Sequence, residues 1–431
     1  MPTVPLLDSE AETRLEEIGS ADVLVGIPSF NNARTVGHVV RAVQYGLAKY
    51  FPQERAVILN SDGRSEDDTR RVVRETSVYS NIDSLLIRHP VRPCAVVSGA
   101  YEGIPGKGSA FRAIFEAARR LGVKACVMVD SDLRSITPEW IEMLAGPVLL
   151  KNYDFVCPSY ARHKYDGTIT NMAVYPLTRA LYGKRVRQPI GGDFGLSGAM
   201  AAHLADQNVW DTDVARFGID IWMTTTALVS GRRICQGFLG AKVHDAKDPA
   251  KNLGPMFSQV MSTLLALARN NVDAWASVRG SQPTPMFGFK SEIAPVPVEV
   301  SVPAMVDRFR EGAAKAAPVW KRALSPETLQ GVESAAAHPD PFVFPAELWV
   351  RVLYETTVAY GQAELSPSGS ATRAAILDAL VPLYFGRTAG YAIETKDMTT
   401  AEAELIVERQ CAKFEELKYT LVERWKERVG G

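Results

Sequence analysis

Short apolar runs alternate with longer amphipathic stretches along the first part of the chain. Each apolar run ends in polar residues, glycine or proline, which is typical of a buried strand that leads into a loop. Each stretch that follows repeats its apolar positions at helical spacing. The predicted strands cover residues 22–30, 55–63, 84–90 and 125–132, and the predicted helices cover residues 35–51, 65–76 and 109–122.

Helix boundaries in this region carry local signals. Ser65 and Asp68 stand at capping-box spacing, and Gly122 follows the last apolar position of the third helix. Thr137 and Pro138 suit the N-cap and first position of a fourth helix. Strands that alternate with helices predict an α/β fold with a mostly parallel sheet, helices on both of its faces, and ligands at the carboxyl ends of its strands.

The rest of the chain predicts a different architecture. Residues 280–303 are rich in proline and show little periodicity, which indicates a crossing segment. Beyond them, long stretches have helical spacing and no clear strand, so we expect a helical C-terminal domain. The predicted ranges are 1–20 for an N-terminal extension, 21–275 for the α/β domain, 276–303 for the crossing segment and 304–431 for the helical domain.

The composition excludes several classes of protein. Of 431 residues, 46% are hydrophobic and 23% are charged, as in a globular protein, and a net charge of -1 gives no general attraction to nucleic acid or anionic membrane. The acidic N-terminus does not resemble a signal peptide, and no apolar run of about 18 residues occurs. Five widely spaced cysteines without a C-x-x-C pair favour a reducing compartment. We therefore expect a cytoplasmic protein with neither nucleic acid nor membrane as a partner.

Two acids follow one buried strand directly. Asp130 and Asp132 project at the strand end with Ser131 between them turned to the other side. Carboxylate oxygens suit Mg²⁺ or Mn²⁺, which can bridge to a diphosphate. The alternative is a turn whose acids only cap the next segment, and a D-x-D pattern alone does not decide between the two.

A glycine-rich loop precedes the third predicted helix. Its glycines let backbone N–H groups approach an anion, and Lys107 between them supplies positive charge. The spacing is not that of a Walker loop, and no G-x-G-x-x-G follows the first strand, which argues against a dinucleotide oxidoreductase. A surface turn with a solvated lysine is the alternative.

Two further residues are candidates because of their neighbours. His244 comes just after an apolar run, where a neutral imidazole could complete a metal shell beside Asp132, although a lone histidine is more often structural. Asp220 lies among apolar residues at a helix entrance, where the usual role is an N-cap. A carboxylate placed beside a substrate hydroxyl is the sharper alternative.

Taken together, these motifs resemble the retaining GT-A glycosyltransferases that make mannosylglycerate, glucosylglycerate and glucosyl-3-phosphoglycerate. The resemblance covers about residues 20–250 and follows the order of the family's motifs. The matching segments are 27–36, 60–69, 105–110, 129–140, 188–197, 217–222 and 242–247. The resemblance implies a GT-A, Rossmann-like catalytic domain with a donor half at about 21–135 and an acceptor half at about 136–275.

The resemblance also implies roles for individual residues. The nucleotide sugar would be bound by Pro28, Ser29, Asn31, Asn32, Asp62, Lys107, Asp130, Ser131, Gly191 and Gly192. A divalent cation, Mg²⁺ or Mn²⁺, would be held by Asp132, His244 and Asp130. Asp220 and Lys107 would act in catalysis, with Asp220 hydrogen-bonded to the sugar or the acceptor.

For the acceptor, residues 160–171 resemble the segment that binds glycerate in the family. Arg162 can hold a carboxylate by two parallel hydrogen bonds, and Asp166, Thr170 and Gly192 would complete the site. The expected reaction is transfer of glucose or mannose from a GDP- or UDP-linked sugar to D-glycerate with retention of configuration. The alternatives are 3-phosphoglycerate as acceptor, or a sensor that binds the sugar nucleotide without catalysis. From the resemblance we also expect a homodimer.

Overall fold

The computed structural model describes residues 6–78, 94–243, 249–290, 295–337, 341–363 and 369–429. The chain divides into two compact units that interleave along the sequence. The first comprises Met1–Ala161, Gln188–Ala246 and Thr284–Pro295, and the second comprises Arg162–Arg187, Lys247–Pro283 and Val296–Gly431. Residues 162–187 and 247–275, which the sequence reading grouped with the α/β domain, therefore cluster with the C-terminal helices.

The first unit is built on an eight-stranded sheet with the order β10-β8-β5-β7-β4-β1-β2-β3. Strand β7 runs antiparallel to both of its neighbours, and all other pairs are parallel. This confirms the predicted mostly parallel sheet. The strands are β1 (Val23–Ser29), β2 (Ala56–Asp62), β3 (Ala95–Ala100), β4 (Ala125–Met128), β5 (Phe155–Ala161), β7 (Phe194–Ser197), β8 (Ile234–Ala241) and β10 (Met286–Phe287).

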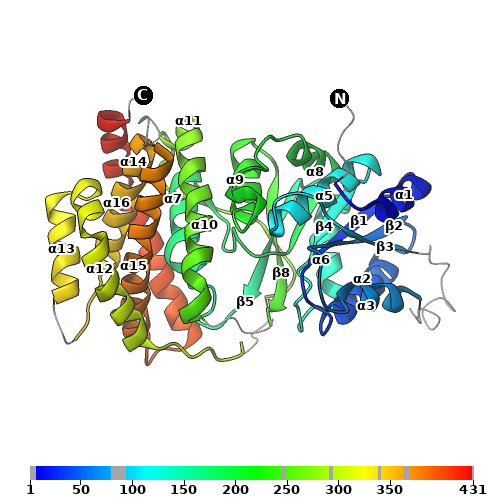
Figure 1. The fold of residues 1–431 in the computed structure, drawn as a ribbon, viewed down its shortest axis with the longest axis horizontal. Coiled ribbons are helices and arrows are strands. Elements are labelled where there is room, and N and C mark those ends of the chain that lie inside the picture. The colour runs from blue at the N-terminus through cyan, green and yellow to red at the C-terminus, as the bar shows by residue number, and fades with distance from the viewer. Residues whose placement is uncertain are drawn as a thin grey trace. The chain divides into compact units, whose positions relative to one another are not determined.

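Helices cover both faces of this sheet (Figure 1). On one face, α2 (Val36–Tyr50) and α6 (Pro138–Lys151) form a buried core with alternate residues of β1. On the other, α5 (Lys107–Arg120) lies so close that a Cβ at Gly26 would be 2.5 Å from Ile114. Successive side chains of β1 point to opposite faces of the sheet, and helices cover both faces, so every residue of this strand is buried.

Several predicted helix and strand boundaries can be compared with the structure. Thr137 is the N-cap of α6 with Pro138 next to it, as predicted. The predicted capping box at Ser65 is wrong, because α3 (Thr69–Val78) begins four residues later and the Ser65 hydroxyl binds Asp62 instead. The predicted strand at 84–90 lies outside the described residues. The remaining elements of the first unit are α1 (Ser9–Ile18), α8 (Gly198–Ala205), η2 (Asp213–Ala215) and α9 (Ile219–Val229).

The segment at 280–303, predicted to be a crossing segment, contains two short strands. These are the two-residue strands β9 (Gln282–Pro283), which pairs with β6 (Lys184–Arg185), and β10, which extends the large sheet. Prolines are compatible with such short edge pairings because few backbone donors are needed.

The second unit is helical, as predicted for the C-terminal part of the chain. Helix α7 packs against α16, and α10 packs against α14 and α15, which is why residues 162–187 and 247–275 join this unit. Its helices are η1 (Thr170–Val174), α7 (Tyr175–Tyr182), α10 (Pro249–Asn270), α11 (Val272–Trp275), α12 (Val302–Ala323), α13 (Pro326–Ala337), α14 (Ala346–Ala363), α15 (Gly369–Glu394) and α16 (Thr400–Arg428).

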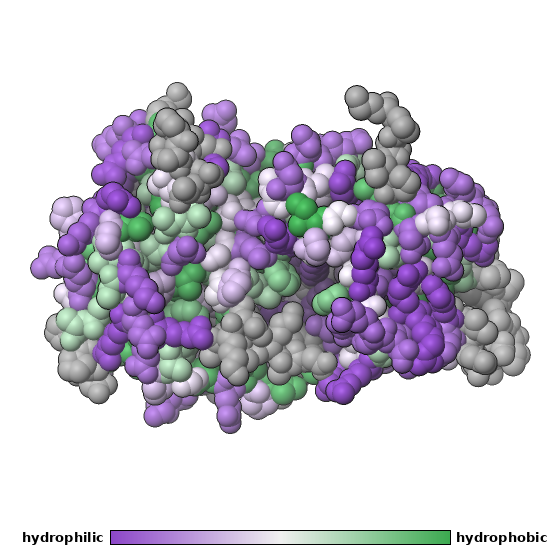
Figure 2. Space-filling model, in the orientation of Figure 1, coloured by the Kyte–Doolittle hydropathy of each residue, from purple (hydrophilic) through white to green (hydrophobic). Residues whose placement is uncertain are grey.

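The distribution of hydrophobic residues on the surface is that of a globular protein. In the view of Figure 2, hydrophilic residues make up most of the coloured surface and hydrophobic ones occur in small groups. Among the described residues, none of the helices combines the length and apolar character that a membrane span requires. All five cysteines are free thiols.

Candidate active site

Candidate residues of the first unit meet at one edge of its sheet. Parallel strands bring their carboxyl ends to the same edge, so Ser29 at the end of β1 is in register with Asp62 at the end of β2. Because β7 is antiparallel, its first residue, Phe194, pairs with Met128, the last residue of β4. The residues just before β7 therefore lie beside those just after β4, and Asp193 comes next to Asp130.

The carboxylate of Asp62 braces the loops after β1 and β2. Its Oδ1 accepts from the hydroxyls of Ser29 at 2.8 Å and Ser65 at 2.7 Å, and its Oδ2 accepts from the Ser65 backbone N–H at 2.8 Å. Asp62 is fully buried, and Pro28 lies within β1 opposite Ser61. These contacts fix the shape of the loop that the sequence assigned to a nucleotide.

The two asparagines after β1 connect that loop to the acidic strand end. Asn32 Oδ1 accepts from the Ser131 hydroxyl at 2.8 Å and from the Phe30 backbone N–H at 3.0 Å. Asn31 adopts a left-handed backbone conformation (φ 55°), which asparagine tolerates better than most residues, and its side chain accepts from the Glu66 N–H. The structure thus brings together the predicted residues Asn32 and Ser131, 99 positions apart in sequence.

Lys107 joins two of the predicted acids. It is the first residue of α5, and its Nζ lies 2.9 Å from Asp130 Oδ1 and 3.5 Å from Asp220 Oδ1. The start of α5 is held against the segment before α9, since a Cβ at Gly108 would be 1.8 Å from the carbonyl oxygen of Val214. Close backbone packing therefore explains the glycine at position 108, and anion binding by the loop stays a prediction.

The diglycine turn at Gly191 and Gly192 is held by Asp220 and lies against Asp130. Asp220 Oδ2 accepts from the backbone N–H groups of Gly191 at 3.2 Å and Gly192 at 2.8 Å. Gly192 has φ 84°, and a Cβ there would be 2.0 Å from Asp130 Oδ2, so any other residue would be strained and would displace this carboxylate. Asp220 is not an N-cap, because α9 begins at Ile219 with Gly218 in that position.

Three buried residues of this cluster were not predicted from the sequence. The Lys242 ammonium donates to Asp130 Oδ2 at 2.8 Å, Asp193 Oδ2 at 2.7 Å and the Gly191 carbonyl at 2.7 Å. The Tyr160 hydroxyl contacts the Asp193 carboxylate and lies 3.0 Å from the Gly191 oxygen. A lysine at the end of an apolar strand was the available signal for Lys242, whereas Asp193 required knowledge of the direction of β7.

The charges of this cluster support one another. Burial opposes the charge of Lys107, but Asp130 and Asp220 outweigh it and hold the pKa of this lysine above its ordinary range. Burial likewise opposes ionisation of Asp130, yet Lys107 and Lys242 keep the pKa of its carboxyl well below the usual value. Burial raises the pKa of Asp193 against the pull of Lys242. Lys107 and Asp130 are therefore an ionised pair at neutral pH.

The predicted metal ligands differ in their surroundings. Both oxygens of Asp130 face lysine ammonium groups. Asp132 is partly exposed and makes no hydrogen bond or ion pair within the described part of the chain, whereas His244 lies outside the described residues. The residue before His244, Val243, accepts from Arg134 N–H at 2.9 Å. Within the described ranges, no three His, Cys, Asp or Glu side chains gather as a metal-ligand group.

Three of the predicted acceptor residues, Arg162, Asp166 and Thr170, belong to the second unit, whereas Gly192 belongs to the first. Arg162 Nε lies 3.6 Å from Asp166 Oδ2, and Thr170 is buried at the start of the π-helix η1. The carbonyl groups of η1 have outside partners, since Trp349 Nε1 donates to Met172 and Gln410 Nε2 donates to Asn171. Such π-turns frequently occur at functional sites.

Two cations beside these residues are already engaged. Lys164 donates to the carbonyls of Thr395, Lys396 and Met398, just after the end of α15. Arg187 binds Glu404 through two hydrogen bonds of 2.6 and 2.7 Å.

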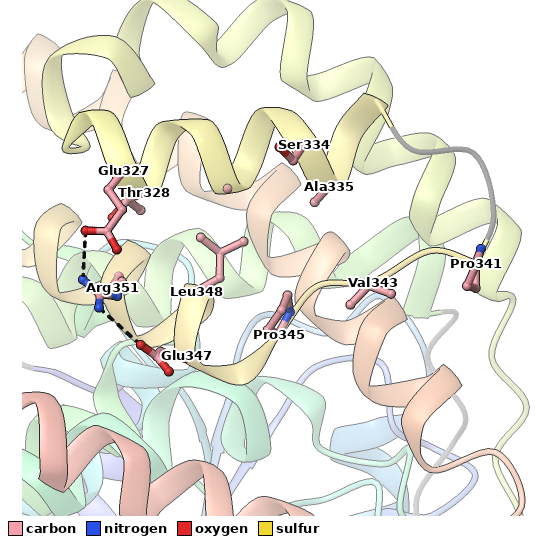
Figure 3. Close-up of a pocket in the computed structure, with 11 residues that line it drawn as sticks. Glu327, Thr328, Ser334, Ala335, Pro341, Val343, Pro345, Glu347, Leu348 and Arg351 are labelled. Atoms are coloured by element: carbon pink, nitrogen blue, oxygen red, sulfur yellow. Dashed lines mark hydrogen bonds and ion pairs between the residues drawn. The ribbon is translucent and has the colours of Figure 1, made fainter.

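A pocket of about 520 Å³ in the second unit lies between α13, α14 and the segment before α14 (Figure 3). Arg351 on its wall pairs with Glu327 at 3.5 Å and with Glu347 at 3.2 Å. None of the predicted site residues is among those that line it. Among the described residues that line it, Arg351 is the only cation and is paired with two acids, so we do not assign the chemistry to this pocket.

No protein-family model matches the chain, and no curated protein matches it either. Several solved structures are similar to it. A glucosyl-3-phosphoglycerate synthase from Mycobacterium tuberculosis in complex with Mn²⁺, uridine diphosphate and glucosyl-3-phosphoglycerate is 24% identical, with 59% of this chain and 83% of that chain covered and a TM-score of 0.44. The same enzyme in complex with phosphoglyceric acid is 22% identical at the same coverage, with a TM-score of 0.43. A mycobacterial protein is 22% identical, covering 62% and 84% of the two chains, with a TM-score of 0.42.

Proposed function

We propose that this chain is a metal-dependent retaining glycosyltransferase that moves glucose or mannose from a nucleotide diphosphate sugar to D-glycerate. The observation that carries the proposal is the cluster at the carboxyl edge of the sheet. There Lys107 pairs with both Asp130 and Asp220, and Asp220 holds the diglycine turn by its backbone N–H groups. A cation for a diphosphate and polar groups for a sugar thus stand beside the loop after β1.

The donor would bind along this edge. Pro28, Ser29, Asn31 and Asn32 form a braced loop for the nucleoside, connected through Ser131 to the acidic strand end. Ligands of open α/β sheets bind at this edge of the strands. Guanosine and uridine, and glucose and mannose, all remain compatible with these contacts.

A divalent cation fits the charge of the site. Lys107 and Lys242 face Asp130, Asp193 and Asp220, so acids outnumber cations, and a diphosphate would be repelled without further positive charge. We propose Asp132 and His244 as the ligands, because Mg²⁺ and Mn²⁺ use few protein groups together with substrate phosphates. Asp130, with both oxygens on lysines, would instead hold those lysines in place. The cation, when bound, would neutralise the departing diphosphate.

The side chains of the chain itself support retention of configuration. An inverting enzyme needs a base aimed at the acceptor hydroxyl. Asp220 accepts from two backbone N–H groups through Oδ2, and its Oδ1 faces the Lys107 ammonium at 3.5 Å. Asp193 is enclosed by Tyr160 and Lys242. Within the described part of the cluster, therefore, neither acid is placed as a dedicated base. Lys107 would stabilise charge on the leaving diphosphate, and Asp220 would orient the sugar or acceptor.

We propose glycerate rather than 3-phosphoglycerate as the acceptor, because two cations near the proposed acceptor residues already bind protein groups. A phosphate would add about two negative charges and needs its own cationic cluster. Lys164 donates to backbone carbonyls and Arg187 to Glu404, whereas Arg162, which lies 3.6 Å from Asp166, would hold the single carboxylate of glycerate. Asp166 and Thr170 would hold the hydroxyl groups.

The test is a panel of nucleotide sugars with Mn²⁺, assayed with glycerate and with 3-phosphoglycerate, and with the product analysed by proton NMR. We expect an α-linked glycerate product. Arg162→Ala should lower kcat/KM for glycerate at least about tenfold, or about 1.4 kcal/mol in transition-state binding, while Lys184→Ala, an exposed cation of the same segment, should not. A preference for 3-phosphoglycerate or a β-linked product would contradict the proposal.

A sensor that binds a sugar nucleotide without catalysis is the rival of another class. It would bind the donor yet show neither transfer nor hydrolysis with Mn²⁺. The wild-type assay separates the two, and Lys107→Ala, which should abolish turnover while the fold persists, assigns any turnover to this site.

We also propose a homodimer formed by the second unit. Leu405 and Tyr419 on α16 are 57% and 54% exposed, and both would be covered if this helix took part in the interface. Light scattering that shows a monomer would refute this.

A further inference from the structure

The second unit contains an arginine whose binding edge is filled by a carboxylate. Arg187 donates from Nε to Glu404 Oε1 at 2.6 Å and from Nη2 to Glu404 Oε2 at 2.7 Å. This is the edge of a guanidinium that binds phosphate or carboxylate groups by two parallel hydrogen bonds. Glu404 therefore sits where an anionic ligand of Arg187 would sit.

Arg187 is next to the segment proposed to bind the acceptor. Its Nη2 also donates to Asn171 Oδ1 at 2.9 Å, and Asn171 directly follows Thr170. The Asn171 side chain in turn donates to the carbonyl of Asp166 at 3.4 Å. Arg187 is thus separated from the proposed acceptor residues by one side chain.

We propose that Glu404 determines which acceptor charge the site accepts, by neutralising Arg187 so that a phosphorylated hydroxy acid is excluded. This inference rests on the proposed function. Glu404 acts through Arg187 and touches no substrate, so it is a specificity-determining and positioning residue. With Glu404 ionised, the Arg187–Glu404 pair has no net charge, so Arg187 adds no net attraction for a second anionic group. Without that carboxylate, Arg187 would present a positive charge to a phosphate group.

A purely structural role for Glu404 explains the arrangement less well. Helix α16 is attached to α7 independently, because Arg179 pairs with Glu408 and Glu415 at 2.6 Å each. The η1 carbonyls are held by Gln410 and Trp349, as described above. The Glu404 side chain is 41% exposed, so its loss leaves no buried cavity. The carboxylate therefore changes the charge at Arg187 more than it changes the attachment of the helix.

Glu404→Gln tests the inference with little change of shape, because it removes the negative charge and leaves one amide oxygen in place of the two oxygens that accept from Arg187. We expect the ratio of kcat/KM for 3-phosphoglycerate to that for glycerate to rise at least about tenfold, with a matching gain in 3-phosphoglycerate binding by calorimetry. The double variant Glu404→Gln/Arg187→Gln should return to the wild-type ratio. Glu408→Gln, one turn further along α16 and paired with Arg179, is the matched control and should leave the ratio unchanged.

The outcomes separate the inference from the proposed function. If the wild-type chain transfers sugar to glycerate and Glu404→Gln changes neither the ratio nor the binding of 3-phosphoglycerate, the role of Glu404 is wrong and the proposed function stands. If the gain persists in the double variant, it does not act through Arg187. If the wild-type chain transfers sugar to neither acceptor and binds neither, the proposed function fails and this inference fails with it.

Discussion

Lys242 and Asp193, 49 positions apart in sequence, form a buried ion pair of 2.7 Å behind the diglycine turn. The Lys242 side chain is 3% exposed and that of Asp193 is fully buried, so neither charge can turn to solvent when its partner is lost. The pair also holds the position of Gly191 through its carbonyl oxygen. The Lys242–Asp193 pair is thus a buried ion pair that supports the charged residues of the site from within the fold.

Lys242→Met should therefore destabilise the fold by about 3–5 kcal/mol, since removing one partner leaves a buried charge uncompensated. Lys242→Met/Asp193→Asn should lose less than the sum of the two single variants, because the double variant leaves less charge unpaired. Thermal unfolding followed by circular dichroism measures both. Lys151→Met, at an exposed lysine, serves as the control and should leave Tm nearly unchanged. Additive losses would show that the two side chains are not coupled.

Gly192→Ala should lower kcat/KM about a hundredfold, because the new Cβ would stand 2.0 Å from Asp130 Oδ2 and displace the carboxylate that binds Lys107. Gly231→Ala is a matched control, since that residue also has positive φ (66°) but has no atom within 4 Å of a new Cβ. Both variants share the backbone strain, and only Gly192→Ala adds the collision. Equal activities of the two would contradict the role of the turn.

Removal of divalent cations should abolish turnover, and Mg²⁺ or Mn²⁺ should restore it, because acids outnumber cations around the proposed diphosphate site. Asp132→Ala should lower the affinity for Mn²⁺, measured by calorimetry in the presence of nucleoside diphosphate, and should lower activity with it. Asp206→Ala, at an exposed acid after α8, should do neither. Near-normal turnover of Asp132→Ala in metal-free buffer would exclude the assignment.

We expect His163 to contribute to the free energy of unfolding in a way that is lost at acidic pH. Its Nδ1 accepts from the Val298 N–H at 3.2 Å, and burial, together with Lys164, lowers the pKa of the imidazole below its ordinary 6.5. The unfolded chain therefore takes up this proton first, so the contribution is present above pH 6.5 and is lost as pH falls through the lowered pKa.

His163→Gln keeps a hydrogen-bond acceptor that does not titrate. Its Tm should fall less than that of the wild type between about pH 7.5 and about pH 5, since only the wild type loses the His163 contribution. His38→Gln, at an exposed histidine, should follow the wild type. Parallel curves for His163→Gln and the wild type would show that this imidazole titrates equally in the folded and unfolded chain.

Local patterns were enough to predict the strands and helices that frame the donor edge. Apolar runs and helical spacing placed β1, β2, β4, α2 and α5, and a parallel sheet brings the ends of such strands together whatever the details of packing. Ser29, Asp62 and Asp130 could be assigned to one edge for that reason. The same patterns misplaced the start of α3, because the Ser65 hydroxyl binds Asp62 instead of capping the helix. They also missed the two strands in the proline-rich segment, because two residues are too few to show a period.

Long-range geometry fixed the rest. Asp193 joins the site because β7 runs antiparallel to β4, so the start of β7 lies beside Asp130. The hydrophobic pattern of a four-residue strand does not indicate in which direction the strand runs. The assignment of Arg162 and Thr170 to the helical unit, and the pairing of Arg187 with Glu404 217 positions later, likewise depend on which apolar faces pack together. A sequence pattern specifies which face of an element is apolar. The partner of that face depends on the free energy of packing the whole chain.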